Sequence, residues 1–167
     1  IYYLADYPKY TESLVKWFTN HWGRFHPERD FKAWESELHF NKDKFPMTLI
    51  ALDENGAEPK LVGKAALRVG IHPDLGLSDF ESRVWLERVY VDPAERGKRI
   101  ASLLIEESIR IAEMAQFDEK PVRELVLLSR DAGGLYKKYG WAEIARPEYK
   151  GGPVSLMIRE IKPVSVL

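Results

Sequence analysis

The chain has 167 residues, which suffices for one compact domain but not for two of ordinary size. It contains no cysteine, which excludes disulfides, thiolate zinc sites and a cysteine nucleophile, and its net charge of -1 lacks the basic surplus typical of nucleic-acid binders. No apolar run approaches the roughly 18 residues of a membrane span, and no secretory signal is seen. We therefore expect a single cytoplasmic domain over residues 1–167 that binds neither nucleic acid nor membrane.

The first third of the sequence predicts a short strand and two helices. Residues 1–4 are β-prone, and apolar residues recur at helical spacing over residues 10–22. Asp30 is placed to cap a second helix, which we expect to reach about Asn41. The apolar stripe of that helix is expected to consist of Phe31, Trp34 and Leu38.

The middle of the chain predicts three strands, a long loop and a long helix. The three strands are expected at residues 47–52, 61–69 and 84–91, and the helix at residues 100–117. Residues 70–82 carry proline, glycine and polar residues and are expected to form a loop, of the kind that often binds ligands. The buried face of the helix is expected to consist of Leu104, Ser108, Ile111, Ala112 and Ala115.

The last third predicts a buried strand, a short helix and two closing strands. Residues 124–129 form a continuous apolar run, typical of a strand covered on both faces. A short helix is expected at 132–139, ended by Gly140, and strands near 141–145 and 154–161. Because helices and strands interleave in the order β-α-α-β-β-β-α-β-α-β-β, we expect an α/β or α+β fold.

Residues 85–104 place a strand, a tight turn and a helix in succession, an arrangement that can bind an anion. The first turn of a helix has backbone N–H groups without internal partners, and the helix dipole adds to their effect. Arg96, Lys98 and Arg99 add positive charge at the same point, and Gly97 lets the backbone approach an anion closely. The alternative is a solvated basic turn. Neither the dinucleotide fingerprint nor a Walker loop occurs.

This stretch resembles the cofactor motif of the GCN5-related N-acetyltransferase (GNAT) family, Q/R-x-x-G-x-G/A after a V-x-P strand end. Arg96, Arg99 and Ala101 take the three motif positions, and residues 91–93 match the strand end. The family usually has glycine where Arg99 stands, and the amide can serve if Arg99 is helical, which arginine tolerates. Residues 132–141 resemble a second family motif, A-x-x-L/F-Y-x-x-x-G-F, with tryptophan as the last residue.

The resemblance implies a fold and a cosubstrate. The fold is a mixed, mostly antiparallel central sheet of about six to seven strands flanked by about four helices, and the cosubstrate is acetyl-CoA. The cofactor pyrophosphate is expected at the amides of residues 97–102, the acetyl carbonyl at a strand amide around residues 89–91, and the pantetheine arm at Ser129 and Arg130. The implied cofactor-binding residues are Val89, Tyr90, Val91, Arg96, Gly97, Lys98, Arg99, Ile100, Ala101, Ser102 and Ser129.

Acyl transfer to an amine needs a base, a stabilised oxyanion and an acid for the leaving thiolate. Tyr136 is similar in position to the family's general acid, and its alternative role is packing on the sheet. Glu87 is the base candidate, because the family often places an acidic residue on this strand. The strand residues expected to share one side are Trp85, Glu87, Val89 and Val91. A buried acid among apolar residues would have a raised pKa, whereas the alternative is a solvent-facing Glu87.

Three functional hypotheses follow. The first is direct transfer of acetyl from acetyl-CoA to a primary amine of a small molecule in a ternary complex, since a cysteine acyl-enzyme is excluded. The second is acetylation of a peptide or protein amine, and the third is a non-catalytic CoA-binding sensor, supported only by Arg99. The four histidines lack metal-ligand spacing, so we expect no metal site.

Contacts to the acceptor are expected from the first two helices and from the loop at residues 70–82. Acidic residues near this side favour a cationic acceptor: Asp74, Asp79, Glu81 and Glu87. The alternative is that the loop acids face solvent, and neighbouring basic residues can also neutralise them: Lys64, Arg68 and Arg83.

Overall fold

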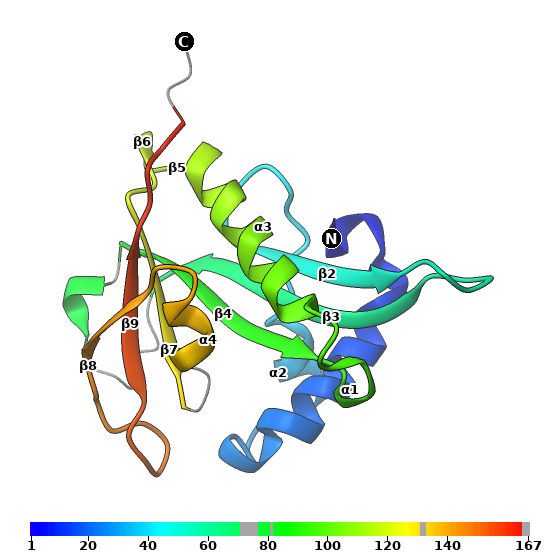
Figure 1. Cartoon of the computed structure of the whole chain (residues 1–167). Coiled ribbons are helices and arrows are strands. Elements are labelled where there is room, and N and C mark those ends of the chain that lie inside the picture. The colour runs from blue at the N-terminus through cyan, green and yellow to red at the C-terminus, as the bar shows by residue number, and fades with distance from the viewer. Residues whose placement is uncertain (71–76, 81, 131–132, 165–167) are drawn as a thin grey trace.

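A central sheet organises the chain. The computed structural model describes residues 1–70, 77–80, 82–130 and 133–164, and within them the sheet has seven strands in the order β1-β2-β3-β4-β7-β9-β8 (Figure 1). These strands are β1 (Tyr2–Tyr3), β2 (Met47–Asp53), β3 (Lys60–Val69), β4 (Val84–Val91), β7 (Glu124–Ser129), β8 (Ala142–Ala145) and β9 (Ser155–Glu160). Every neighbouring pair is antiparallel except β4 and β7, which run parallel. The expected fold class is confirmed, and each strand of the sheet lies within one residue of its predicted bounds.

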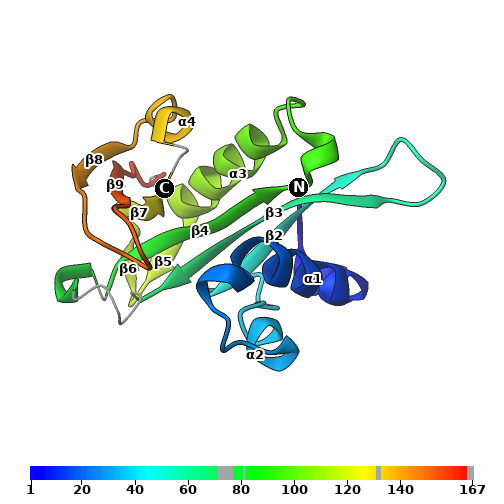
Figure 2. The same ribbon diagram turned by 90° about the horizontal axis from the view of Figure 1, so that it is seen from below.

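Helices cover both faces of the sheet. Helices α1 (Thr11–Trp22) and α2 (Phe31–Glu35) lie on one face, and α3 (Ile100–Met114) and α4 (Gly133–Lys137) lie on the other (Figure 2). Successive strand side chains point to opposite faces, so Leu49 packs in the core under α3 while Ile50 packs in the core under α1. Burial on both faces accounts for the apolar run in β7, whose Leu125, Val126 and Leu127 are all buried.

The second helix is shorter than the sequence predicts. Asp30 caps it as expected, its side chain accepting a hydrogen bond from the Ala33 amide at 2.8 Å, but α2 ends at Glu35 rather than near Asn41. The reason is tertiary, because Phe40 already forms an antiparallel bridge with Met47 and so draws the chain into the sheet. Phe31, expected in the apolar stripe, is 48% exposed.

Helix α3 also ends earlier than predicted, at Met114 rather than Phe117. The next residues form a small hairpin of β5 (Gln116–Phe117) and β6 (Lys120–Pro121). The predicted helix face is otherwise confirmed, since Leu104, Ser108, Ile111 and Ala112 are buried and Ala115 is half-buried. Most of the predicted loop at residues 70–82 lies outside the described residues, which include a 3-10 turn at Ser78–Phe80.

Candidate active site

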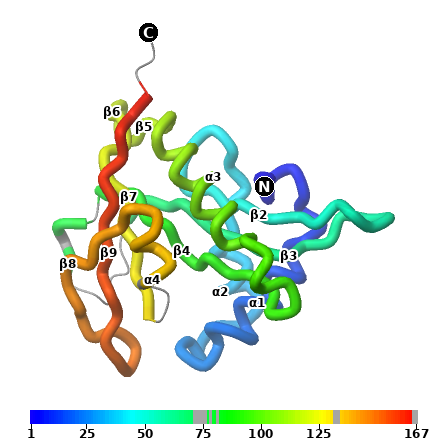
Figure 3. The backbone as a smooth tube through the Cα atoms, in the orientation of Figure 1, coloured from blue at the N-terminus to red at the C-terminus, as the bar shows by residue number. Residues whose placement is uncertain are grey.

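The sheet opens at its centre, between the parallel strands β4 and β7. They pair only through Val84 with Leu125 and Trp85 with Val126, and beyond these pairs the strands part (Figure 3). A cavity of about 310 Å³ lies at this divergence. Its walls come from β4, from the end of β7, from Tyr136 of α4, from the last residues of α1 and the turn after it, and from Tyr149 and Lys150 between β8 and β9.

A β-bulge in β4 shapes the cavity wall. The register between β3 and β4 shifts between Lys64, which pairs with Tyr90, and Ala66, which pairs with Glu87, and Arg88 has a φ of 49°. An extra residue in one strand reverses the facing of every residue that follows it. The predicted alternation is therefore wrong beyond Glu87, because Val89 packs in the core under α3 instead of sharing the face of Trp85.

Glu87 is buried, with 8% of its surface exposed, and lines the cavity. It does not face solvent. Its surroundings, however, are charged rather than apolar, since Arg68 Nη1 lies 3.7 Å from Glu87 Oε2. The expected apolar setting for this carboxyl group is thus wrong, because Arg68 and Lys64 of β3 share its face.

A second carboxylate, Glu37, gathers three arginines beneath the cavity. It accepts hydrogen bonds from Arg29 and, at 2.7 Å, from Arg88, and Arg68 lies 3.6 Å away. Burial alone would raise the pKa of Glu37, but Arg88 and Arg29 outweigh it and lower the pKa to about 2. Arg68 therefore lies between two carboxylates and links Glu37 to Glu87.

Lys64 is fully buried beside this cluster. Its Nζ lies 4.6 Å from the centre of the Phe18 ring and has no hydrogen-bond partner within the described parts of the chain. Burial, reinforced by Arg88, lowers its pKa well below the usual value of 10.5, although Glu87 and Glu37 oppose the shift. A lysine so placed contributes little positive charge to the cavity floor.

Tyr136 reaches the cavity from the other face of the sheet. It lines the cavity while its ring lies edge-on to Trp141, with centroids 5.8 Å apart. Burial raises the pKa of Tyr136 to about 12, so the phenol keeps its proton over the whole physiological range. Tyr136 therefore packs on the sheet and also lines the cavity, so its packing does not remove it from reach of a bound substrate.

The turn before α3 has the geometry of an anion site. Gly97 has a φ of 81°, and no atom lies within 4 Å of a side chain built there. The first helical hydrogen bond runs from the Leu103 amide to the Arg99 carbonyl, so the amides before it belong to the first turn. These amides are those of Ile100, Ala101 and Ser102.

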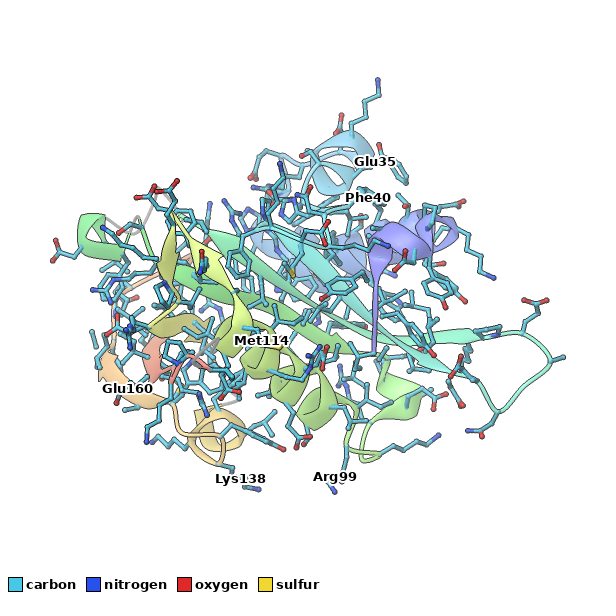
Figure 4. The ribbon with its side chains drawn as sticks, turned by 90° about the horizontal axis from the view of Figure 1, so that it is seen from above. Glu35, Phe40, Arg99, Met114, Lys138 and Glu160 are labelled. Carbon is cyan, nitrogen blue, oxygen red and sulfur yellow. The ribbon has the colours of Figure 1, made fainter. Side chains whose placement is uncertain are left out.

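Arg99 adopts a left-handed conformation, with φ 62° and ψ 13°. The condition set above for its amide, a helical conformation, is therefore not met. This conformation favours glycine, which explains why the resembling motif has glycine at the position, and a side chain there costs about 1 kcal/mol. The Arg99 side chain points outward from the start of α3, on the opposite side of the molecule from Glu35 (Figure 4), and is 76% exposed.

The three basic side chains of the turn do not all converge. Lys98 Nζ binds Glu95 Oε2 at 2.6 Å, and Lys60 binds the other oxygen at 2.6 Å. Arg96 donates to the Val91 carbonyl at 3.3 Å. Lys98 was expected to add positive charge to the anion site at this turn. Its charge is instead neutralised by Glu95, so that expectation is only partly met.

The remaining predicted cofactor residues lie along the diverging strands. Val89 and Ser129 line the cavity. Tyr90 offers only its backbone on this side, because its ring packs against Trp17, 5.0 Å away between centroids. Val91 ends β4 just before the turn.

Sequence reasoning missed much of the cavity wall on the α1 face. The residues it did not single out as site residues are His21, Trp22, Arg24, Phe25, His26, Arg88, Tyr149 and Lys150. Apart from His21 and Trp22, which end α1, they belong to a turn, a bulge and a hairpin tip, which carry no periodic signal. Burial lowers the pKa of both His21 and His26, so neither adds charge at neutral pH.

The acidic loop residues do not form part of the described wall. Asp74 and Glu81 lie outside the described residues, and Asp79 does not line the cavity. Among the residues that the structure covers, no group of three or more acidic or histidine side chains is placed to hold a metal ion. Nor is any helix there long and apolar enough to cross a membrane.

Comparison with known proteins agrees with this geometry. A family model described as "Acetyltransferase (GNAT) family" matches residues 11–141. No curated protein sequence matches the chain.

Solved structures give the same architecture. The chain is similar to NAA60 of Arabidopsis thaliana in complex with a bisubstrate analogue, with 16% identity over 94% of this chain and 95% of that one and a TM-score of 0.68. It is also similar to an aminoglycoside 6'-N-acetyltransferase complexed with coenzyme A, with 15% identity, 95% and 94% coverage and a TM-score of 0.65. It is similar as well to GCN5 of Tetrahymena, with 17% identity over 93% of this chain and 91% of that one and a TM-score of 0.55. At these identities the likeness establishes the fold.

Proposed function

Because the chain belongs to the acetyltransferase (GNAT) family, we propose that it transfers acetyl from acetyl-CoA directly to a primary amine in a ternary complex. The observation that carries the proposal is the cavity between β4 and β7, which brings Glu87 and Tyr136 together from opposite faces of the sheet. Acetyl-CoA is supported as cosubstrate by similar structures that contain acetyl-CoA or coenzyme A.

In this proposal the cofactor runs from the turn before α3 along β4 to the cavity. The pyrophosphate would bind the amides from Gly97 to Ser102, where the open space beside Gly97 leaves room for it. The pantetheine arm would follow the divergence of β4 and β7 past Ser129. Free amides of β4 around residues 89–91 would then meet the acetyl carbonyl.

Two side chains carry the proton transfers in this proposal. Glu87, directly or through a water, takes a proton from the acceptor ammonium, and the free amine attacks the thioester carbonyl. When the tetrahedral intermediate collapses, the C–S bond breaks and the leaving thiolate takes the phenolic proton of Tyr136, while the second proton lost by the attacking nitrogen returns the phenolate to the phenol. With its pKa raised to about 12, Tyr136 is protonated at neutral pH, as a general acid must be before it reacts, and the sequence has no cysteine to form an acyl-enzyme.

The test is release of free CoA thiol from acetyl-CoA in the presence of small amines and of short peptides. We expect amine-dependent release with intersecting initial-velocity lines, because both substrates are bound together. Glu87→Gln should lower turnover about 10²- to 10⁴-fold without weakening CoA binding. Parallel lines would rule out direct transfer, and a protein that does not bind CoA at all would refute the proposal.

A further inference from the structure

The charged groups of the cavity wall are mostly basic. Four basic side chains line it, namely Arg24, Arg88, Arg130 and Lys150, against the single carboxylate of Glu87. Arg88 is already paired with Glu37. Arg24 and Arg130, in contrast, have no carboxylate within ion-pair distance among the residues that the structure covers.

Arg24 and Arg130 converge on one aromatic ring. The guanidinium carbon of Arg24 lies 4.5 Å from the centre of the Phe25 ring, and that of Arg130 lies 4.8 Å from the same centre. Phe25 ends the 3-10 turn Gly23–Phe25 that follows α1, whereas Arg130 follows β7. Two like charges close to the same ring repel each other, and an anion bound by both would relieve that repulsion.

The hairpin tip between β8 and β9 fixes the direction of Arg130. Its Nη2 donates to the carbonyl oxygens of Tyr149 at 2.5 Å and Lys150 at 3.1 Å. Positive φ values at Lys150 and Gly151 form the tight turn. A side chain built at Gly152 would come within 3.3 Å of Arg130 Nη1. The tip therefore holds the guanidinium in place and leaves its remaining N–H donors for a ligand.

We infer that the acceptor amine also carries an anionic group, a carboxylate or a phosphate, which Arg24 and Arg130 bind while the amine lies near Glu87. This inference rests on the proposed acetyl transfer. It runs against the cationic acceptor expected from the acidic loop residues, none of which lines the described wall. The segment Gly23–Phe25, which carries Arg24, follows α1, and α1 lies on the face of the sheet opposite α3 (Figure 2). The inference therefore assigns Arg130 to the acceptor rather than to the pantetheine arm, where the sequence analysis expected it.

The test uses acceptors matched in their amine. Butylamine is compared with 4-aminobutyrate, and a 2-amino sugar with its phosphate ester, so that carboxylate and phosphate are distinguished. In each pair kcat/KM is measured, and binding to the CoA-loaded protein is measured by calorimetry. The variants are Arg24→Met, Arg130→Met and Arg130→Lys, and the control is Arg110→Met, an exposed arginine paired with Glu107 on α3.

We expect the anionic member of at least one pair to be favoured about tenfold or more, because charge-assisted hydrogen bonds are strong. Arg24→Met and Arg130→Met should remove most of that preference by raising the KM of the anionic acceptor. Arg130→Lys should restore part of the preference, and Arg110→Met should leave it unchanged. High salt should weaken it.

Turnover of butylamine with no gain from either anion would overturn this inference and leave the acetyltransferase proposal standing. A preference that survives in both methionine variants would overturn it as well. Calorimetry tests the inference independently of turnover. If neither 4-aminobutyrate nor the sugar phosphate binds the CoA-loaded protein, the inference is overturned even if no acceptor reacts. Absence of CoA binding would instead refute the acetyltransferase proposal.

Discussion

Arg88 Nη1 donates a hydrogen bond to Glu37 Oε2 at 2.7 Å, which joins the bulge of β4 to the segment that follows α2. The guanidinium of Arg88 also lies 5.4 Å from the centre of the Phe18 ring. Glu37 thus neutralises Arg88, which is adjacent to the base candidate Glu87, and holds the segment after α2 against the sheet. The left-handed conformation of Arg88 brings this side chain and Glu87 to the same face.

Replacing Glu37 by glutamine should destabilise the protein by about 2 kcal/mol, because the change leaves three arginines close together without their carboxylate. For a chain of this length the loss lowers Tm by about 4 to 8 °C. The control is Glu12→Gln, which breaks the exposed pair with Lys16 and should change stability by less than about 1 kcal/mol. Equal effects of the two changes would show that the Glu37 cluster is no stronger than a surface pair.

The contribution of Glu37 should depend on acid pH. Its pKa is about 2 in the folded protein against a usual value of 4.5, so the unfolded chain takes up the proton first. The stabilisation is therefore fully present above about pH 5 and declines as pH falls toward 2. Urea unfolding of parent and Glu37→Gln at pH 7 and pH 3.5 should show a smaller difference at pH 3.5, and a constant difference would contradict the assigned pKa.

Arg99→Gly should stabilise the protein by about 1 kcal/mol, since glycine adopts the left-handed conformation without steric cost. The ion pair that is lost, with Glu106 at 3.7 Å, is exposed and worth little. The same change at Arg110, in the interior of α3, is the control and should cost about 1 kcal/mol. Thermal unfolding measures both, and a shift of the same sign in the two variants would argue against strain at Arg99.

Gly97→Val should remove the response of the protein to CoA. Gly70→Val is a matched control, because Gly70 also has a positive φ, of 97°, and open space around it. Both variants should lose intrinsic stability through backbone strain. At a hundredfold excess over the dissociation constant, CoA should stabilise the parent and the Gly70 variant by about 2.7 kcal/mol. Retention of that shift in Gly97→Val would place the pyrophosphate elsewhere.

Tyr136→Phe should lower turnover about 10²- to 10⁴-fold with CoA binding nearly intact. Tyr139→Phe is the control, since the Tyr139 hydroxyl donates to Glu106 at 3.3 Å on the exposed side and does not line the cavity. Because the pKa of Tyr136 is raised to about 12, its ionisation should not lower the parent rate below about pH 11. A descending limb near pH 10 that disappears in Tyr136→Phe would contradict this pKa.

The sequence predicts the parts of the molecule that depend on periodicity and on local motifs. The strands of the sheet and the turn at Gly97 belong to this class, because alternation, helical spacing and glycine preference are local properties. The bulge at Arg88 was not predictable, since one extra residue in β4 is visible only against the register of β3. The contact between Phe25 and Arg130 was missed for a related reason, because these residues meet only through the tertiary fold.

Only two residue pairs join β4 to β7 among the described residues, so the two halves of the sheet share a short seam. Beyond the seam, alternate backbone N–H groups of β4 have no β7 partner among the described residues, and N–H groups outside a strand ladder exchange their hydrogens faster than paired ones. A ligand lying there would act as an added strand and slow that exchange. Isotope uptake along β4 would therefore record occupancy of the divergence, even for a ligand whose turnover is too slow to measure.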